Sequence, residues 1–454
     1  MYLLYSLMLA LGLVVLLPRF AIDALRAGKY VTGLRERLGR ITFQHNDHRP
    51  LIWLHCVSVG EAEAAKPLVK ALRERFPLHR LAVSTTTVTG QQVAQRAFPD
   101  AAKIFYFPLD LNWIVRRVLR ALQPSAVLII ETELWPNLLR ECHRRSIPVA
   151  LLNGRISQTS FRRYLWIRGF MRRVLSNISV AIMQSQADAE RIRELGMPTD
   201  RLLTHGNMKF DGAELSERDR SLAESFRDRF AFSPDQNIIV AASTHDPEET
   251  ILIDAFRRLI DSQNASPARL IIAPRHPERF AEVTKQLEAS GFKCAYRSAP
   301  ESDVDRFANV ILLDSIGELR AVYACAEVAI VGGSIAPRGG HNVLEPACQG
   351  RCTVTGPHMN NFAAIKSALL AEDAMVQLPE VPIEEAASVL ASTFRDLLND
   401  RDRRQQIGRR ARAVCDRNRG ATEKTIQTIS QLLQQTEAAD QPISIPALPA
   451  TATK

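Results

Sequence analysis

The stretch LIWLHCVSVGEAEA at residues 51–64 contains the local pattern on which this chain is built. Its first seven residues form a continuous apolar run, which is typical of a strand buried on both faces of a parallel sheet. The turn Ser58-Val59-Gly60 follows, and helical periodicity then extends over residues 61–76. The stretch predicts a buried strand that passes directly into a helix, the repeating unit of an α/β fold.

Short apolar runs of the same kind recur along the chain, separated by helical stretches and by one polar region at residues 211–235. They lie at residues 80–87, 126–131, 149–154, 180–185, 237–244, 269–274, 309–315, 327–334 and 352–357. We expect two Rossmann-like, doubly wound α/β domains facing each other across a cleft at the carboxyl ends of their strands.

The expected domain boundaries follow from these patterns. The N-terminal Rossmann-like domain is expected at residues 21–212. The C-terminal Rossmann-like domain, with its terminal helices, is expected at residues 213–435. The Pro- and Ala-rich residues 436–454 read as a disordered tail.

The first 17 residues, MYLLYSLMLALGLVVLL, are uncharged and apolar, and a basic cluster follows them. As a helix they span about 26 Å, slightly less than a bilayer core. A cleaved signal peptide should carry positive side chains before its apolar run, and this one has none. We expect a membrane anchor helix at residues 1–20, either crossing the bilayer once or lying in its interface, with the folded body on the cytoplasmic side.

Composition narrows the possible partners. The formal net charge of +9 suits an anionic partner, but no basic stripe interleaved with aromatic residues indicates nucleic acid. The seven scattered cysteines are typical of a reducing compartment, with most of them acting as small buried apolar residues. Cys348 and Cys352 lie near His341 and His358, but without a second cysteine pair we do not expect a zinc site.

Charged residues follow the predicted strands of the first half. Glu61 begins a helix, where an acid either offsets the helix dipole or acts as a general base toward a hydroxyl group. Glu131 ends the run AVLII, where a carboxylate could stabilise positive charge in a transition state, and Glu133 competes for that role. Lys209 is either a solvated surface residue or a cation that neutralises a phosphate or carboxylate group.

The second half carries features suited to an anionic ligand. Arg275 follows a strand, where a guanidinium can pair with phosphate. The turn Gly317-Glu318 opens a helix, and paired glycines at residues 332–333 and 339–340 permit close backbone approach to a ligand. Asn342 is expected to be the N-cap of the helix that follows. The sequence Asp303-Val304-Asp305 has the letters of a metal-binding motif but reads as a solvated loop.

Nine segments, taken in order, resemble the Kdo (3-deoxy-D-manno-octulosonic acid) transferases of lipopolysaccharide synthesis, which have the two-domain GT-B glycosyltransferase fold. They are SVGEAEA (58–64), STTTVTG (84–90), ETELWPN (131–137), NGRIS (153–157), GNMKFD (206–211), APRHPERF (273–280), IGEL (316–319), GGS with RGGHNVLEP (332–346) and GPHMNNF (356–362).

The resemblance implies inverting transfer of Kdo from CMP-Kdo to the glucosamine hydroxyl of a tetra-acylated lipid A precursor (lipid IVA), at the bacterial inner membrane. It implies an acceptor domain in the first half and a donor domain in the second. It maps the proton acceptor onto Glu61 and a transition-state-stabilising pair onto Glu131 and Lys209. No metal is expected. The implied CMP contacts are Pro274, Arg275, Ile316, Gly317, Glu318, Asn342, Val343, Leu344 and Glu345, with Glu345 on the ribose hydroxyls.

Two other hypotheses fit parts of the pattern. A different GT-B enzyme, such as a sugar-nucleotide epimerase or a UDP-sugar transferase, would share the fold and the acid at Glu345. A membrane-tethered scaffold that binds acidic lipid would need no carboxylates at two strand ends.

Overall fold

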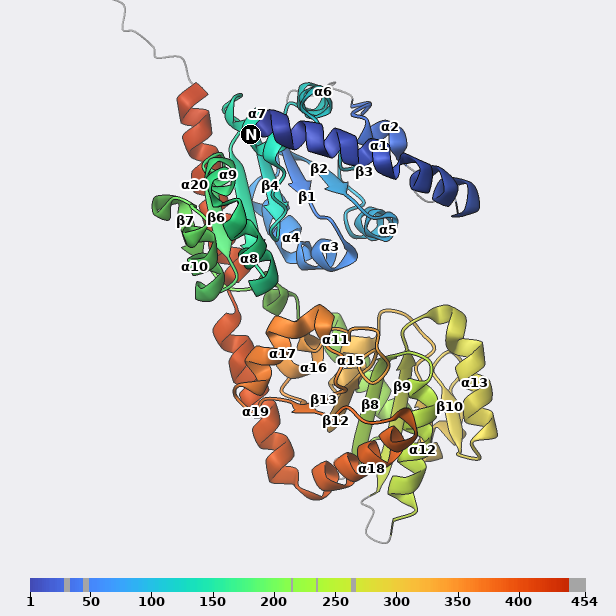
Figure 1. The fold of residues 1–454 in the computed structure, drawn as a ribbon. Coiled ribbons are helices and arrows are strands. Elements are labelled where there is room, and N and C mark those ends of the chain that lie inside the picture. The colour runs from blue at the N-terminus through green and yellow to red at the C-terminus, as the bar shows by residue number, and fades with distance from the viewer. Residues whose placement is uncertain (28–32, 44–48, 214, 234–235, 263–266, 441–454) are drawn as a thin grey trace, which may run out of the picture. The chain divides into compact units, whose positions relative to one another are not determined.

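The computed structural model describes residues 1–454 except 28–32, 44–48, 214, 234–235, 263–266 and 441–454 (Figure 1). The chain forms two compact units, one made of residues 1–212 and 419–454 and the other of residues 213–418. Each unit is a parallel sheet covered by helices, which confirms the expected pair of α/β domains.

Unit 1 contains a seven-stranded sheet in the order β3-β2-β1-β4-β5-β6-β7, and the paired strands are parallel. Trp53 of β1 is fully buried, and its Nε1 donates to Ser84 Oγ of β2 at 2.8 Å. The strands are β1 (Leu51–His55), β2 (Arg80–Thr85), β3 (Lys103–Tyr106), β4 (Ala126–Ile130), β5 (Val149–Gly154), β6 (Val180–Met183) and β7 (Leu202–Thr204).

The helices of unit 1 follow the strands in alternation, as crossover connections between parallel strands require. The segment predicted as one helix at residues 61–76 is divided into two. The helices are α1 (Tyr2–Ala27), α2 (Leu34–Arg37), α3 (Val59–Ala64), α4 (Lys66–Arg75), α5 (Val88–Ala97), α6 (Asn112–Leu122), α7 (Pro136–His143), α8 (Gln158–Trp166), α9 (Arg168–Leu175), α10 (Gln186–Glu194), the 3-10 turns η1 (Thr199–Arg201) and η2 (Met208–Ala213), and α20 (Ala421–Asp440).

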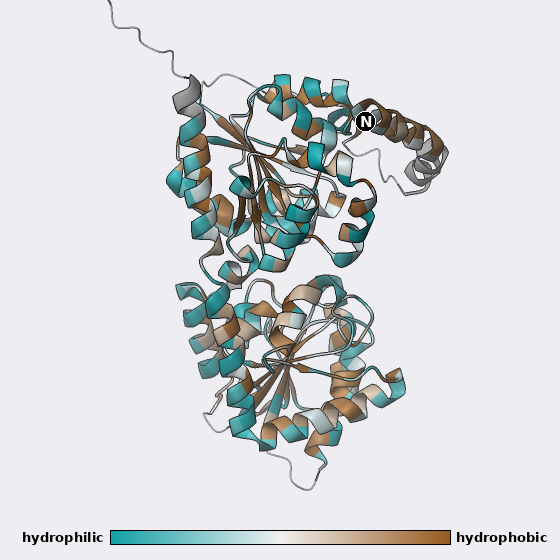
Figure 2. Cartoon of the chain, turned by 60° about the vertical axis from the view of Figure 1, so that its left-hand side comes forward, coloured by the Kyte–Doolittle hydropathy of each residue, from teal (hydrophilic) through white to brown (hydrophobic). Residues whose placement is uncertain are grey.

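Unit 2 contains a second parallel sheet in the order β10-β11-β9-β8-β12-β13-β14. The strands are β8 (Asn237–Thr244), β9 (Ala268–Pro274), β10 (Cys294–Tyr296), β11 (Val310–Leu312), β12 (Val328–Val331), β13 (Cys352–Thr355) and β14 (Val376–Gln377). The helices are α11 (Glu217–Arg229), α12 (Glu248–Ile260), α13 (Phe280–Ala289), α14 (Val304–Phe307), α15 (Leu319–Tyr323), α16 (Leu344–Cys348), α17 (Ala363–Leu370), α18 (Ile383–Asn399) and α19 (Arg401–Asn418), with the 3-10 turns η3 (Pro277–Arg279) and η4 (Asn360–Phe362). Figure 2 shows apolar residues concentrated on the strands of both sheets.

Both sheets have a switch point, where two neighbouring strands send the chain in opposite directions along the sheet. In unit 1 it lies between β1 and β4, and in unit 2 between β8 and β12. In open parallel sheets, ligands bind outside the carboxyl ends of the strands at this point. The segments that follow these four strands are therefore where functional side chains are expected.

The last helix belongs to unit 1, so the expectation that residues up to 435 complete the second domain is wrong. Ile426, Ile429 and Leu433 of α20 are buried in one core cluster with Leu68 and Leu72 of α4. The amphipathic pattern of α20 shows that one face is buried but cannot show which unit buries it. The helix continues to Asp440, inside the segment predicted as a disordered tail, and the remainder of that prediction lies outside the described residues.

Helix α1 is held to unit 1 by aromatic and polar side chains. The Tyr5 hydroxyl donates to Asp110 Oδ2 at 3.0 Å, and the Tyr2 hydroxyl donates to the Arg173 carbonyl at 3.0 Å. Several apolar side chains in its first half lie on the surface; Leu3, Leu7 and Leu11 are 86%, 63% and 62% exposed. No helix in the described parts of the chain has the length and apolar character needed to cross a membrane.

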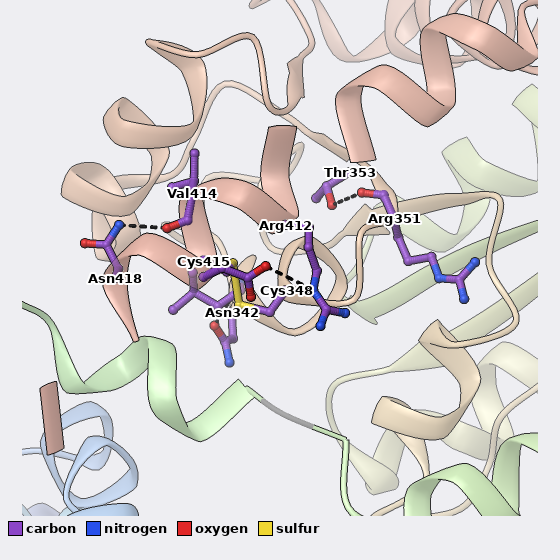
Figure 3. Close-up of a disulfide and its surroundings, with 10 residues drawn as sticks. Asn342, Cys348, Arg351, Thr353, Arg412, Val414, Cys415 and Asn418 are labelled. Atoms are coloured by element: carbon purple, nitrogen blue, oxygen red, sulfur yellow. Dashed lines mark hydrogen bonds and ion pairs between the residues drawn. A yellow bond between two sulfur atoms is a disulfide. The ribbon is translucent and has the colours of Figure 1, made fainter. Parts of the chain in front are cut away.

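Two features of unit 2 differ from the sequence interpretation. Cys348 of α16 and Cys415 of α19 form a disulfide (Figure 3), although they are 67 residues apart and the sequence gives no sign of the pair. Asp305, predicted to lie in a solvated loop, is only 3% exposed, and it accepts from Arg229 Nε at 2.8 Å. The buried guanidinium of α11 therefore holds this aspartate in the interior.

Candidate active site

Glu61 lies in the first turn of α3, directly after β1. Its side chain is folded back, so that Oε2 accepts from the Val57 backbone N–H at 2.6 Å and Oε1 accepts from the Ser58 hydroxyl at 3.2 Å. The residue is only 7% exposed, whereas Glu63, two positions further on, is exposed and pairs with Lys66. The local sequence thus places one carboxylate inward and the next one outward.

The environment of Glu61 shifts its protonation. Burial and, to a smaller degree, the nearby charges of Glu131 and Glu133 raise the pKa of Glu61 to about 8, against the lowering effect of the Val57 hydrogen bond. Burial and the charge of Glu131 likewise raise the pKa of Glu133 to about 7. Carboxyl groups that change charge near neutral pH are common at sites of proton transfer.

Glu131 and Lys209 form an ion pair next to this carboxyl group. Lys209 Nζ lies 2.8 Å from Glu131 Oε1, and each side chain is about a quarter exposed, 23% for Lys209 and 24% for Glu131. The two residues are 78 positions apart in the sequence. The structure therefore brings together the three residues that the sequence named, Glu61, Glu131 and Lys209, at the carboxyl edge of one sheet.

The backbone that positions this pair is strained. Glu131 has a φ of 59° and Asn153, at the end of the neighbouring β5, has a φ of 55°, both in the left-handed region that side chains disfavour. Asn153 is almost fully buried, and its Oδ1 accepts from the Met208 backbone N–H at 3.0 Å, which fixes the segment carrying Lys209. Such strained residues cluster at functional sites, where the surrounding structure enforces them.

The implied donor residues of unit 2 gather at the carboxyl edge of its sheet. Arg275 follows β9; its backbone N–H donates to the Thr244 carbonyl at 3.0 Å and its side chain is exposed. Ile316 and Gly317 are also exposed, and Gly317 has a φ of 88°. Glu318 accepts from Arg297 Nε at 3.0 Å and from Arg297 Nη2 at 2.8 Å, so its carboxylate already has a cation partner.

The segment HNVLE connects the glycine-rich loop to α16. The N-cap of α16 is Val343, so the expectation that Asn342 takes this position is wrong, although Asn342 Oδ1 does accept from the Leu344 backbone N–H at 3.2 Å. Asn342 Nδ2 also donates to Glu345 Oε1 at 3.2 Å. Glu345 is partly exposed and lies 3.8 Å from Arg320 Nε. Val343 and Leu344 are buried, so only their backbone can meet a ligand.

The segment HDPEE (residues 245–249), which follows β8, was not among the functional segments predicted from the sequence. Glu248 is fully buried, and its carboxylate accepts hydrogen bonds from the backbone N–H groups of residues 333–336 and of His245, at 2.7 to 3.0 Å. Burial raises the pKa of Glu248 even though these bonds favour its ionised form. The glycine loop is therefore folded around an internal carboxylate. The rule that singled out Glu61, polar residues directly after a buried strand, would also have found this segment.

His245 also contacts the other end of the glycine loop. Its Nε2 lies 2.7 Å from His341 Nε2, and the two rings are nearly parallel. Gly333 has a φ of 64°, and a Cβ there would lie 2.8 Å from the His341 ring, so glycine is required both by the backbone and by the histidine.

The implied donor residues do not line the hollow found at the opposite edge of the unit 2 sheet. A hollow of about 390 Å³ lies at the amino ends of β8 and β9, lined by residues such as Gln236, Ala268 and Asn309, and none of the implied donor residues lines it. Among the described residues, no group of three or more His, Cys, Asp or Glu side chains is arranged to hold a metal ion.

The fold has solved counterparts. A UDP-GlcNAc 2-epimerase from Neisseria meningitidis superposes with a TM-score of 0.55 over 84% of this chain and all of that one, at 12% identity. The C-terminal CMP-Kdo binding domain of WaaA from Acinetobacter baumannii is 30% identical, covers 44% of this chain and 98% of that domain, and has a TM-score of 0.39. The two parallel α/β units resemble the GT-B fold of glycosyltransferases.

Relatives that match most of the chain show the family to which it belongs. The family model for 3-deoxy-D-manno-octulosonic-acid transferase (kdotransferase) matches residues 32–212. The 3-deoxy-D-manno-octulosonic acid transferase of Haemophilus influenzae is 33% identical over 91% of this chain and 94% of that protein, and that of Bordetella pertussis is 33% identical over 84% and 87%. The chain belongs to the family of 3-deoxy-D-manno-octulosonic acid transferases, and it is an enzyme.

The packing of His341 on Gly333 can be tested by adding a single methyl group. Gly333→Ala places a Cβ against the His341 ring and forces a residue other than glycine to keep a positive φ, so we expect it to lower stability by about 2 kcal/mol. Gly291→Ala is the matched control, because Gly291 has a similar φ of 75° and a Cβ added there would have nothing within 4 Å. Its cost should be about 1 kcal/mol. Equal shifts of the thermal midpoint in the two variants would show that the histidine contact contributes nothing.

Proposed function

We propose that the enzyme transfers Kdo from CMP-Kdo to a glucosamine hydroxyl of a tetra-acylated lipid A precursor and releases CMP, with inversion at the anomeric carbon. The observation that carries this proposal is the grouping of the buried Glu61 carboxyl with the Glu131–Lys209 ion pair at the switch point of unit 1. Membership of the Kdo transferase family supports the choice of sugar.

Glu61 is proposed as the general base. A sugar hydroxyl is a poor nucleophile until its proton is removed as the new bond forms, and a carboxylate within hydrogen-bond reach can accept that proton. A pKa of about 8 makes Glu61 a stronger base than an ordinary carboxylate, and it leaves about a tenth of the groups ionised at pH 7. A single in-line attack by the hydroxyl, with CMP leaving from the opposite side, gives inversion.

Glu131 and Lys209 are proposed to stabilise the charges that develop during transfer. The sugar carbon gains positive character as its bond to phosphate breaks, and Glu131 is a fixed negative charge that favours this. Lys209 offers a cation for the carboxylate of the acid sugar or for the departing phosphate. Their 2.8 Å contact keeps both side chains in place before substrate arrives.

The donor nucleotide is proposed to bind unit 2. Arg275 presents an exposed guanidinium to the phosphate, and the Glu345 carboxylate suits the ribose hydroxyls. The remaining proposed contacts, which include backbone groups at the same sheet edge, are Pro274, Ile316, Gly317, Glu318, Asn342, Val343 and Leu344.

We propose that transfer needs no metal ion. The leaving group is a monophosphate ester, whose charge is smaller than that of a nucleoside diphosphate, and arginine and lysine side chains can balance it. Transfer activity should therefore be unchanged after dialysis against EDTA, and loss of activity that Mg²⁺ restores would contradict this.

Glu61→Gln should reduce kcat for Kdo transfer by about 10²-fold to 10⁴-fold, because the amide cannot accept the hydroxyl proton. Binding of CMP, measured by calorimetry, should be unchanged. Glu63→Gln is the matched control, since this exposed neighbour on the same helix should retain full activity. Transfer at the normal rate by Glu61→Gln would rule out the assignment of the base.

The pH dependence of transfer follows from the raised pKa of Glu61. Only the ionised form accepts a proton, so kcat/KM should rise with pH and level off above about pH 8. The Glu131 charge helps to raise that pKa, so Glu131→Gln should move the rise to lower pH in addition to lowering the rate. A profile that is flat between pH 6 and pH 9 in the wild-type enzyme would contradict a carboxyl base of this kind.

We propose that α1 attaches the enzyme to the cytoplasmic face of the inner membrane. The hydroxyl groups of Tyr2 and Tyr5 bond to unit 1, whereas Leu3, Leu7 and Leu11 are left exposed, which suits an in-plane helix with apolar side chains among the lipid chains. The basic surplus of the chain would favour anionic lipid. The lipid A precursor, the proposed acceptor, would be met in the same membrane.

Leu7→Glu combined with Leu11→Glu should reduce binding to vesicles containing anionic phospholipid several-fold in a flotation assay, because two carboxylates replace apolar groups in the interface. Leu78→Glu is the control, since Leu78 is 70% exposed on unit 1 but lies outside α1. Undiminished flotation of the double variant would argue against attachment through α1.

A further inference from the structure

Two histidines meet across the switch point of the unit 2 sheet. His245 follows β8, and His341 follows the glycine loop that begins after β12. Their Nε2 atoms are 2.7 Å apart, and their ring planes differ by 7° with centroids 5.0 Å apart. His276, which follows β9, lies edge-on to His245 at 5.2 Å. All three strand ends therefore contribute an imidazole ring to one small area.

The available charged or titratable groups around the pair are mainly basic. Arg275 and His276 face it from the segment after β9, and Arg338 faces it from the glycine loop. The acidic neighbours are Glu248 and Glu249 of α12. Both are fully buried and already have partners: the Glu248 carboxylate is bound by loop N–H groups, and Glu249 Oε1 accepts from the Thr244 hydroxyl and from Arg279 Nη1. The available groups at this edge thus favour an anion.

The His245–His341 pair can carry more protons than the two that its rings hold when both are neutral. A 2.7 Å contact between two Nε2 atoms requires one of them to carry a proton and the other to accept it, so two neutral rings satisfy the bond. Burial, together with the nearby cations, lowers the pKa of His245 and lowers that of His341 to about 4. Without a ligand the pair is therefore neutral at pH 7.

We propose that the His245–His341 pair is a proton-coupled anion site, which takes up one proton from solvent when the phosphate group of CMP or of the CMP-sugar binds at this edge. The inference rests on the proposed use of a CMP-activated sugar. An anion close to an imidazole favours its charged form, and it also offsets the repulsion from Arg275 and Arg338. The added proton goes to the free Nδ1 of the donating ring, so the bond between the rings becomes charge-assisted.

The same proton has a use in the reaction. When the bond between the sugar carbon and the phosphate oxygen breaks, its electron pair stays on that oxygen. The imidazolium can donate its proton to the phosphate as this charge appears, while the proton of the attacking hydroxyl goes to Glu61. The pair returns to its neutral state, and both protons are later exchanged with solvent. His245 and His341 thus complement the base of unit 1 by assisting departure of CMP.

Calorimetry of CMP binding to the full-length enzyme, in buffers of different ionisation enthalpy between pH 6 and pH 8, measures the linked protons directly. For each CMP bound, the wild-type enzyme should take up to about one proton more from solvent than His341→Gln or His245→Gln takes up. Because the proton is shared, either single variant and the double variant should lose the same uptake. Cytidine, which lacks the phosphate group, should bind to the wild-type enzyme without proton uptake.

His143→Gln, which changes an exposed histidine of α7, is the control and should behave like the wild type. CMP binding with the same proton uptake in wild type and in both pair variants would overturn the anion-site proposal and leave the transferase proposal standing. If CMP and cytidine both fail to bind the wild-type enzyme, both proposals are wrong. Circular dichroism shows whether each variant has folded. If one single variant does not fold, the other single variant still provides the test.

Discussion

The structure depends on the parallel alignment of strands around two switch points. Parallel strands present their carboxyl ends at one edge of the sheet. At a switch point, the segments that follow two neighbouring strands leave in opposite directions. The edge between these two strands is therefore left open. In unit 1 this edge holds Glu61 after β1 and Glu131 after β4. In unit 2 it holds His245 after β8 and the glycine loop after β12. The chemistry proposed for each unit follows from which side chains the sequence places at these four positions.

The sequence was sufficient to predict these positions where the strand signal was strong. Continuous apolar runs identified β1, β4, β8, β9 and β12, and the residue after each run could be read directly. The short edge strands β3, β10 and β14, of two to four residues, carried too little apolar sequence to be separated from the surrounding helices and turns. Contacts between residues far apart in the sequence could not be predicted from the sequence for a different reason. The Glu131–Lys209 contact was known only through resemblance to a family, and the Cys348–Cys415 disulfide and the return of α20 to unit 1 had no local signal at all.

Glu61 can combine a structural role with the catalytic role proposed for it. The bond from the Val57 N–H closes the turn between β1 and α3, as a helix-start acid is expected to do, and it holds the carboxyl group in one orientation. The same burial that this orientation requires raises its pKa toward the range useful for a base. Glu248 illustrates the purely structural case, because its carboxylate is consumed by five backbone N–H groups and has no face left for a ligand.

We propose that one displacement, assisted by the carboxyl group of Glu61, joins Kdo to a lipid-borne hydroxyl. Incubation of the purified full-length enzyme with CMP-Kdo and a tetra-acylated lipid A precursor, followed by mass spectrometry and NMR of the product, tests it most directly. We expect a gain of at least one Kdo unit, released CMP, and an anomeric configuration opposite to that of the donor. Unmodified acceptor, or a product that retains the donor configuration, would contradict it.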